Sequence, residues 1–191
     1  KVLLSLVVTG ITGSVLNTQL SAGVKDVNLS SALVEARSTI FTAEYRFLLA
    51  QGEKDSIVQK VVDDVISSAT TLTSNENTRE VVFLRSPGNT RENNYEIASN
   101  LLDPTSIPST LSERVRKNPD LVYQYTNMNY LTGTRIKGLA IGQKVQIPNA
   151  GQYEMYIIFS LANQENTLYL ISRSLFLGGF ILLLLVALIT W

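Results

Sequence analysis

The sequence predicts an α+β domain in which two helices come first and a small antiparallel sheet follows. Residues 17–73 contain no proline, and part of this stretch has the apolar spacing of a helix. After Thr78 the chain changes to short runs of strand-forming residues separated by turn residues. Helices that precede strands, rather than alternate with them, are typical of an antiparallel sheet. A chain of 191 residues has room for one such domain with appended helices.

Both ends of the chain are apolar. No charge lies in VLLSLVVTGITGSVL after Lys1, and none lies in SLFLGGFILLLLVALITW at the other end. A membrane span needs roughly 20 residues, and about 17 can suffice. We therefore expect truncated transmembrane helices over residues 1–17 and 174–191, with a sensor-sized domain over residues 18–173 between them. A signal-peptide core is the alternative for the first segment, but no clear cleavage site follows it.

Two spans would put both termini on one side of the membrane. Lys1 favours the cytoplasmic side for the amino terminus, which makes residues 18–173 extracytoplasmic in a two-pass cell-membrane protein. The first helix is expected to continue out of the first span, because no turn signal follows Leu16. The stretch IVQKVVDDVISSATTL places its apolar residues on one face of a second helix. Gly52 predicts a turn or kink between the two helices.

Five strands and one short helix are predicted after Thr78. EVVFL and NYEIA predict a hairpin joined by turn residues, and Pro108 and Ser109 open a short helix that closes before Pro119. A bulge is expected in the fourth strand, near Gly138 or Gly142. The predicted strands cover residues 80–84, 94–98, 121–128, 136–147 and 153–161.

The composition excludes several kinds of chemistry. Without cysteine or histidine, these residues cannot form a disulfide, a thiolate metal site, a Ser–His–Asp triad or a phosphohistidine. No glycine-rich phosphate-binding motif is present, so no cofactor is expected. The net charge of zero gives no overall attraction to nucleic acid. Asp63 and Asp64 would diverge on a helix, which favours a solvated face over an active site.

Basic residues and tyrosines supply the candidates for ligand sensing. Residues 111–148 carry six basic and two acidic side chains, whereas residues 17–78 carry five basic and eight acidic ones. The basic region is either an anion site (for a lipid headgroup, cell-wall polymer or small carboxylate) or an ordinary surface that complements the acidic helices. The tyrosines either pack across strands or line a cleft. The candidates are Tyr123, Tyr125, Arg135, Lys137 and Tyr156.

Both ends of the domain resemble a known family. LVVTGITGSVLNTQLSAGVKD, ALVEARSTI, LVYQYTNM and YEMYIIFSLANQENTLYLISR are similar to sequences around the two spans of actinobacterial sensor histidine kinases of the MtrB type. The matching positions include Tyr123 to Tyr125, Gly138 to Gly142, Tyr153 to Leu161, Glu165 and Arg173. Ser160 stands where the family has proline, and the resemblance is poor over residues 51–111.

The order of the elements is similar to that of the PDC/Cache, PAS-like sensor fold, and we expect the domain to act as a homodimer. The resemblance to the family implies a HAMP linker, a phosphoacceptor helix pair and an ATP-dependent histidine kinase domain after the last span. Expected partners are membrane lipid, a response regulator of the MtrA type, an extracytoplasmic lipoprotein and an unknown signal ligand, in control of the cell envelope and division. The last strand and the following helix would transmit the signal, through Tyr153, Phe159, Glu165 and Arg173. Two alternatives stay open: an envelope or division scaffold without signalling output, and a receptor with another cytoplasmic output.

Overall fold

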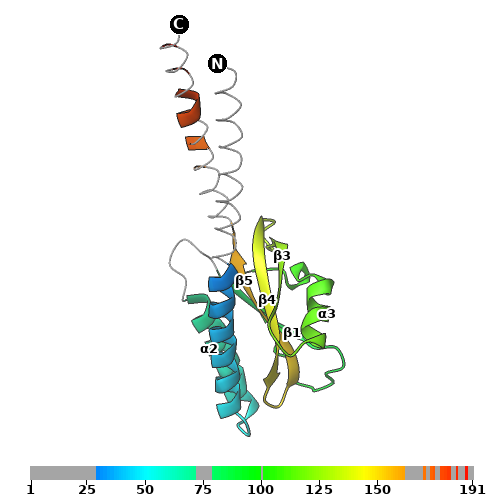
Figure 1. Ribbon diagram of the computed structural model, residues 1–191. Coiled ribbons are helices and arrows are strands. Elements are labelled where there is room, and N and C mark those ends of the chain that lie inside the picture. Colours follow the sequence, from blue (N-terminus) through cyan, green and yellow to red (C-terminus); the bar gives the residue numbers. More distant parts are fainter. Residues whose placement is uncertain are drawn as a thin grey trace. The chain divides into compact units, whose positions relative to one another are not determined.

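The computed structural model describes residues 29–71, 79–99 and 101–161, together with positions 170, 173–174, 177–181, 184 and 188 (Figure 1). Residues Ala32–Ala162 form one compact unit. The span predicted over residues 1–17, most of the span predicted over residues 174–191, and Glu165 lie outside the described residues. Within the described part, no helix is long and apolar enough to cross a membrane.

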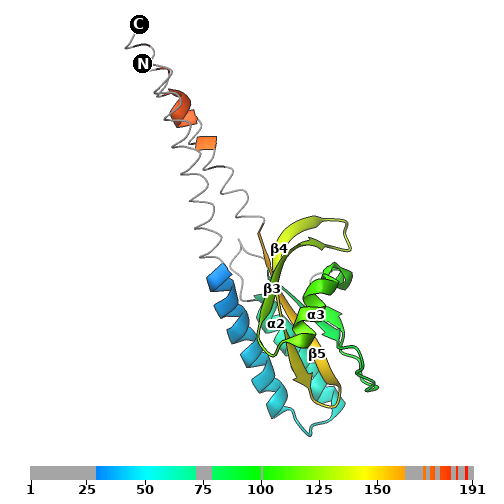
Figure 2. The same ribbon diagram turned by 45° about the vertical axis from the view of Figure 1, so that its right-hand side comes forward.

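The domain is a five-stranded antiparallel sheet with helices on both faces, which confirms the predicted α+β class (Figures 1 and 2). The strand order is β2-β1-β5-β4-β3, so the last strand in the chain lies in the middle of the sheet. A helix over residues 29–49, which we call the long helix, comes first in the chain. The elements that follow it are α2 (Asp55–Thr71), β1 (Arg79–Arg85), β2 (Ile97–Ala98), a 3-10 helix η1 (Pro104–Ser106), α3 (Ser109–Lys117), β3 (Val122–Asn129), β4 (Arg135–Ile147) and β5 (Gly151–Ser160).

The long helix and α2 cover one face of the sheet. Both bury a single apolar face, as the spacing in α2 predicts, and the turn expected between them lies at Gly52, where φ is +85°. Phe47 of the long helix meets Phe83 of β1 edge to face, with 6.1 Å between the ring centroids. Because side chains alternate along a strand, this contact assigns the odd-numbered side chains of β1 to the helix-bearing face. The buried residues of the two helices are Ala32, Ala36, Ile40, Ala43, Phe47, Val58, Val62, Val65, Ile66 and Ala69.

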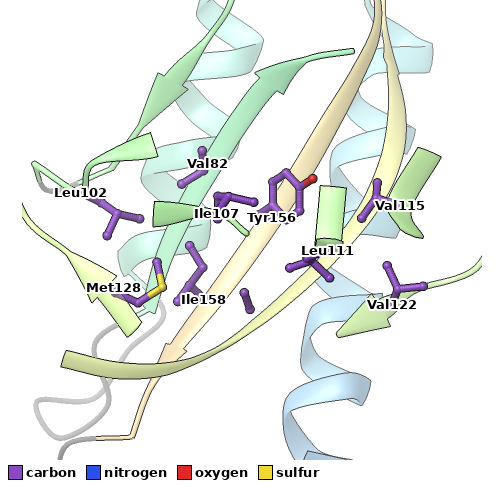
Figure 3. Close-up of a cluster of buried hydrophobic side chains, with 10 residues drawn as sticks. Val82, Leu102, Ile107, Leu111, Val115, Val122, Met128, Tyr156 and Ile158 are labelled. Atoms are coloured by element: carbon purple, nitrogen blue, oxygen red, sulfur yellow. The ribbon is translucent and has the colours of Figure 1, made fainter. Parts of the chain in front are cut away.

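The opposite face of the sheet is covered by α3 and η1. A buried apolar cluster fills this layer (Figure 3) and consists of Val82, Leu102, Ile107, Leu111, Val115, Val122, Met128, Ala140, Tyr156 and Ile158. The α3 helix begins after Pro108 and ends before Pro119, as the sequence predicts. Tyr156 lies between α3 and the sheet in Figure 3, which places its phenol in the middle of the layer.

The predicted bulge in the fourth strand is wrong. The register of β4 with β5 runs without interruption from Gly138 paired with Ser160 to Ile147 paired with Gly151. Gly142 has another role, since a Cβ atom built there would lie 2.6 Å from the ring of Tyr156 and 2.9 Å from Val115. A glycine is therefore needed at this position for side-chain packing rather than for a bulge.

The second predicted strand is shorter than expected. Only Ile97 and Ala98 pair with β1, whereas the sequence predicts a strand over residues 94–98. The hydroxyl of Tyr153 accepts from the amide of Tyr95 at 3.0 Å and donates to the carbonyl of Asn93 at 3.1 Å. Residues 93–95 are thus held by a side chain instead of a strand ladder. The η1 turn has no counterpart among the predicted elements.

Candidate functional site

The five candidate ligand-sensing residues do not converge. Tyr123 and Tyr125 pair with Ile141 and Leu139, which places them on the helix-bearing face of the edge strand β3, half exposed. Arg135 and Lys137 of β4 are exposed and share that face by the alternation of side chains. Tyr156 lies on the opposite face and is fully buried. Four of the five therefore share one open surface, and Tyr156 belongs to a different environment.

Tyr156 belongs to a buried polar group that we call the carboxylate cluster, made of Ser112, Arg116, Glu154 and Tyr156. Glu154 of β5 is 1% exposed, and three side chains donate to its carboxylate. Ser112 Oγ donates to Oε2 at 2.5 Å, Tyr156 OH donates to the same oxygen at 2.6 Å, and Arg116 Nε donates to Oε1 at 2.7 Å. Arg116 Nη2 also donates to Ser112 Oγ at 2.7 Å.

The carboxylate cluster joins α3 to the central strand. A buried carboxylate is tolerated only when it is paired and hydrogen-bonded, and here one cation and two hydroxyls supply both. Ser112 donates its proton to a carboxylate that already receives two other donors, so the arrangement does not activate the hydroxyl as a nucleophile. The cluster therefore fixes the position of α3 on β5 and offers no catalytic chemistry.

Because the pKa of Tyr156 is raised in the folded protein, we predict that the protein loses stability at alkaline pH. Burial, and then the hydrogen bond to Glu154, raise the pKa of Tyr156 in the folded protein. The unfolded phenol, with a pKa of about 10, releases its proton first, so the free energy of unfolding falls as the pH rises above about 10. Urea unfolding at neutral and alkaline pH measures this slope. Tyr156→Phe should reduce it, and an unchanged slope in that variant would contradict the assignment.

A second buried carboxylate lies on the same face of the sheet. Glu80 of β1 accepts from Ser99 Oγ at 2.6 Å and from Tyr130 OH at 3.1 Å. Burial, together with the charge of Glu80, raises the pKa of Tyr130 as well. Ser99 also accepts from the amide of Val81 at 2.8 Å, so this group ties β1 to the turn after β3. Two buried carboxylates therefore flank the apolar cluster of Figure 3.

Arg79 joins three elements at one end of the domain. This first residue of β1 is 1% exposed, its Nε donates to the carbonyl of Ala69 in α2 at 2.5 Å, and its Nη1 pairs with Glu35 of the long helix. In the sheet, Arg79 pairs with Phe159 near the end of β5. Burial lowers the pKa of the guanidinium, while Glu35 opposes that shift. Nη2 is buried without a hydrogen-bond partner, which adds a desolvation cost.

Of the residues proposed for signal transmission, Phe159 lies at the junction that Arg79 forms between β1, α2 and the long helix, and Tyr153 does not. Phe159 is half-buried opposite Arg79, whereas Tyr153 is fully buried at the other end of β5, where its ring tilts against Tyr95. Arg173 is an exposed helical position, and Glu165 lies outside the described residues. The strand β5 thus connects Tyr153 with Phe159.

Two grooves on the helix-bearing side contain none of the five candidates. The larger, of about 750 Å³, lies between the end of the long helix and α2 and includes Arg46, Leu49 and Ile57. The smaller, of about 250 Å³, lies between the long helix and the start of β3. Among the described residues, no group of three or more acidic side chains could hold a metal ion.

The comparisons with known proteins give no family for this chain. No protein-family model matches it, and no curated protein matches it. The sequence did not reveal Ser112, Arg116 and Glu154 as a group, because Glu154 lies 42 and 38 positions after the other two. One signal was present: Glu154 is a lone charge inside YEMYIIFSL, and a charge in such a strand is buried only with partners.

Proposed function

We propose that this chain is the signal-sensing input region of a two-span membrane receptor of the sensor histidine kinase class. The observation that carries the proposal is the junction at Arg79. The long helix follows the first apolar segment of the chain, and β5 leads toward the second. Arg79 bonds to the long helix and pairs with β5 at the end from which the chain leaves the sheet.

Such a junction couples the two chain segments that lead to the membrane. A displacement of β5 relative to β1 would alter the geometry of the pair between Arg79 and Glu35. Signalling of this kind requires two packed arrangements that a ligand or partner favours differently. The unpaired Nη2 of Arg79 is compatible with a second arrangement in which that group finds an acceptor. On this proposal, a change in the bonds of the Arg79 guanidinium would accompany movement of both the long helix and β5.

The finer assignment rests on the resemblance to MtrB-type kinases. A long helix, a second helix and a small antiparallel sheet are the elements that a PDC/Cache, PAS-like sensor would contribute. On this proposal the cytoplasmic part carries the HAMP linker, the phosphoacceptor helices and the kinase domain, and it acts on a response regulator of the MtrA type. An extracytoplasmic lipoprotein would be a further partner of the sensor domain.

The experiment that tests the function combines topology with the downstream gene sequence. Because the chain has no cysteine, a single Gln146→Cys label site at an exposed position reports the side of the membrane. A membrane-impermeant maleimide should label this variant in intact cells, and the codons after Trp191 should encode a HAMP pattern and a histidine-containing helix. Labelling only after permeabilisation would contradict the topology, and a stop codon after Trp191 would favour a scaffold without signalling output.

The homodimer has a candidate surface on the long helix. Val34, Phe41 and Leu48 recur every seven residues, Tyr45 lies beside them, and all four are exposed, Phe41 by 68%. Their face is opposite the buried face that packs on the sheet, because helical residues repeat every 3.6 positions. A seven-residue apolar repeat is typical of a seam between two helices. We propose that a second copy of this chain covers it in a symmetric dimer.

Charge at the centre of the helix seam should disrupt the dimer. Phe41→Glu would place a carboxylate in an apolar contact, so the dissociation constant of the full chain in detergent should rise at least about tenfold. Analytical ultracentrifugation measures it. The control is Lys60→Glu on the exposed face of α2, which should leave the constant unchanged. Equal dissociation constants for Phe41→Glu and the unmodified chain would exclude this face as the interface.

A further inference from the structure

The hairpin formed by β3 and β4 extends past the end of the central strand. The pairing of β4 with β5 ends at Gly138, which lies opposite Ser160. The strand β4 itself begins earlier, at Arg135, and its residues before Gly138 pair with β3 alone. The chain leaves the sheet directly after Ser160, where the amide of Leu161 donates to the carbonyl of Lys137 at 2.9 Å. Figure 2 shows the hairpin at the end of the sheet where β5 terminates. The hairpin tip and the exit toward the second apolar segment therefore share one end of the domain.

Two exposed leucines lie side by side at this tip. Leu131 is 68% exposed and Leu101 is 60% exposed. The amide of Leu131 donates to the carbonyl of Leu101 at 2.8 Å, and an adjacent bridge joins Leu102 to Tyr130. Leu101 has a φ of 60°, a left-handed conformation that is uncommon and strained for a bulky side chain. The fold thus keeps two large apolar side chains in solvent by means of a strained backbone, a combination found at functional sites.

The turn holds this arrangement in place. Residues 131–133 form a three-residue loop, closed by hydrogen bonds between Tyr130 and Thr134 and between Gly133 and Tyr130. Gly133 has a φ of +86°, which is the conformation such hairpin loops require of their last residue. Leu131 is consequently fixed at the start of the loop, where its side chain is exposed. Neither leucine belongs to the apolar cluster of Figure 3.

The hairpin is also basic. Arg135 and Lys137 are exposed on its second strand, and no acidic residue occurs from Leu121 to Tyr153. Two acidic residues bond to the hairpin: Glu80 accepts from the hydroxyl of Tyr130, and the amide of Asp103 donates to the carbonyl of Asn129. The carboxylate of Asp103 is already bonded within its own turn, where it accepts from the amide and hydroxyl of Thr105 at 2.9 and 2.7 Å. Two exposed leucines beside two cations are the combination by which peripheral segments bind anionic membrane surfaces.

We propose that the hairpin tip, Leu101, Leu131, Arg135 and Lys137, contacts the anionic lipid headgroups of the membrane that anchors the chain. This inference rests on the proposed two-span function and names the partner of the basic surface. Twelve residues, 162–173, separate Leu161 from the second apolar segment. The tip lies at the end of the domain from which β5 leads to this segment. On this proposal the two cations meet the headgroups while the leucines enter the apolar boundary beneath them.

A fluorescent label at the tip tests the contact in the full chain. Leu131→Cys, in this cysteine-free protein, carries an environment-sensitive dye, and Gln146→Cys at the other end of β4 carries it as the control. Both are reconstituted in phosphatidylcholine vesicles with and without phosphatidylglycerol. We expect a blue shift and quenching by nitroxide lipids only at position 131 and only with phosphatidylglycerol. Arg135→Gln with Lys137→Gln should lower the equilibrium constant for contact roughly fivefold for each charge removed.

The outcomes separate this inference from the proposed function. A dye at position 131 that stays solvent-like in phosphatidylglycerol vesicles, while the chain floats with them, overturns the contact and leaves the two-span function standing. An equal blue shift in neutral vesicles overturns recognition of the anionic headgroup. A chain that does not float with vesicles overturns the two-span function and this inference with it. The same shift at position 146 would show that the contact is not confined to the hairpin and would also overturn it.

Discussion

Replacement of Glu154 by alanine should lower the free energy of unfolding by about 3 kcal/mol. The substitution leaves the hydroxyls of Ser112 and Tyr156 buried without their acceptor, and it removes the partner of Arg116. Buried polar groups without partners keep their full desolvation cost, whereas Arg116 is partly exposed and turns to water. Urea unfolding followed by circular dichroism measures the change.

Two comparisons make the Glu154 result specific. Glu113→Ala removes an exposed carboxylate of α3 that pairs with Lys117 at 3.9 Å, and it should change stability by less than about 0.5 kcal/mol. The double replacement of Glu154 by leucine and Ser112 by alanine should recover part of the loss, because it leaves fewer unpaired groups. A loss of less than about 1 kcal/mol for Glu154→Ala would mean that water already reaches the cluster.

Gly142→Ala should cost about 2 to 3 kcal/mol, although it adds only one methyl group. The new Cβ would lie 2.6 Å from two ring carbons of Tyr156 and 2.9 Å from Val115 of α3. The ring cannot move away freely because its hydroxyl is bonded to Glu154. We therefore expect α3 to shift as well, and thermal unfolding together with the near-ultraviolet signal of the tyrosines would detect both effects.

Gly138→Ala is the matched control on the same strand. Its Cβ would lie 3.0 Å from Met128 Cγ and 3.2 Å from both the side chain of Ile158 and a backbone carbonyl, so the neighbours must move by less. Methionine is flexible and adapts to irregular space. The loss should consequently be smaller, below about 1.5 kcal/mol. If both alanine variants were equally stable, the ring of Tyr156 would not lie against Gly142 as described.

Much of the fold could be predicted because local patterns agree with it. The apolar spacing of α2, the turn at Gly52, and the prolines around α3 each determine one element without help from distant residues. The strands β3, β4 and β5 are similarly evident from their composition. The strand order could not be derived in this way, since it depends on which strands exchange hydrogen bonds across β5. Nor could the role of Gly142, which depends on a ring fourteen positions later in the chain.

The site could be predicted less well than the fold. The period of two correctly placed Tyr123 and Tyr125 on one face of β3. Gln124 lies on the other face, where it accepts a hydrogen bond from Thr110 in the first turn of α3. The alternation within a strand could not show that Tyr156 lies on the opposite face of the sheet from Tyr123 and Tyr125. Which side chains of two strands share a face depends on the register between the strands. Arg79, Ser112 and Glu154 were not among the candidates, since isolated polar residues acquire a role only through partners that are 10 to 44 positions away.

The central place of β5 has a consequence for the order in which the domain can fold. Both neighbours of this strand precede it in the chain, so β1 has no long partner until the polypeptide is complete to Ser160. The adjacent strands β3, β4 and β5 can assemble as a local meander, whereas closing β1 onto β5 joins residues about 75 positions apart and is expected to be slow. Until then, the backbone hydrogen-bonding edge of β1 that faces β5 stays unpaired. A domain of this topology would therefore depend on protection against aggregation during synthesis.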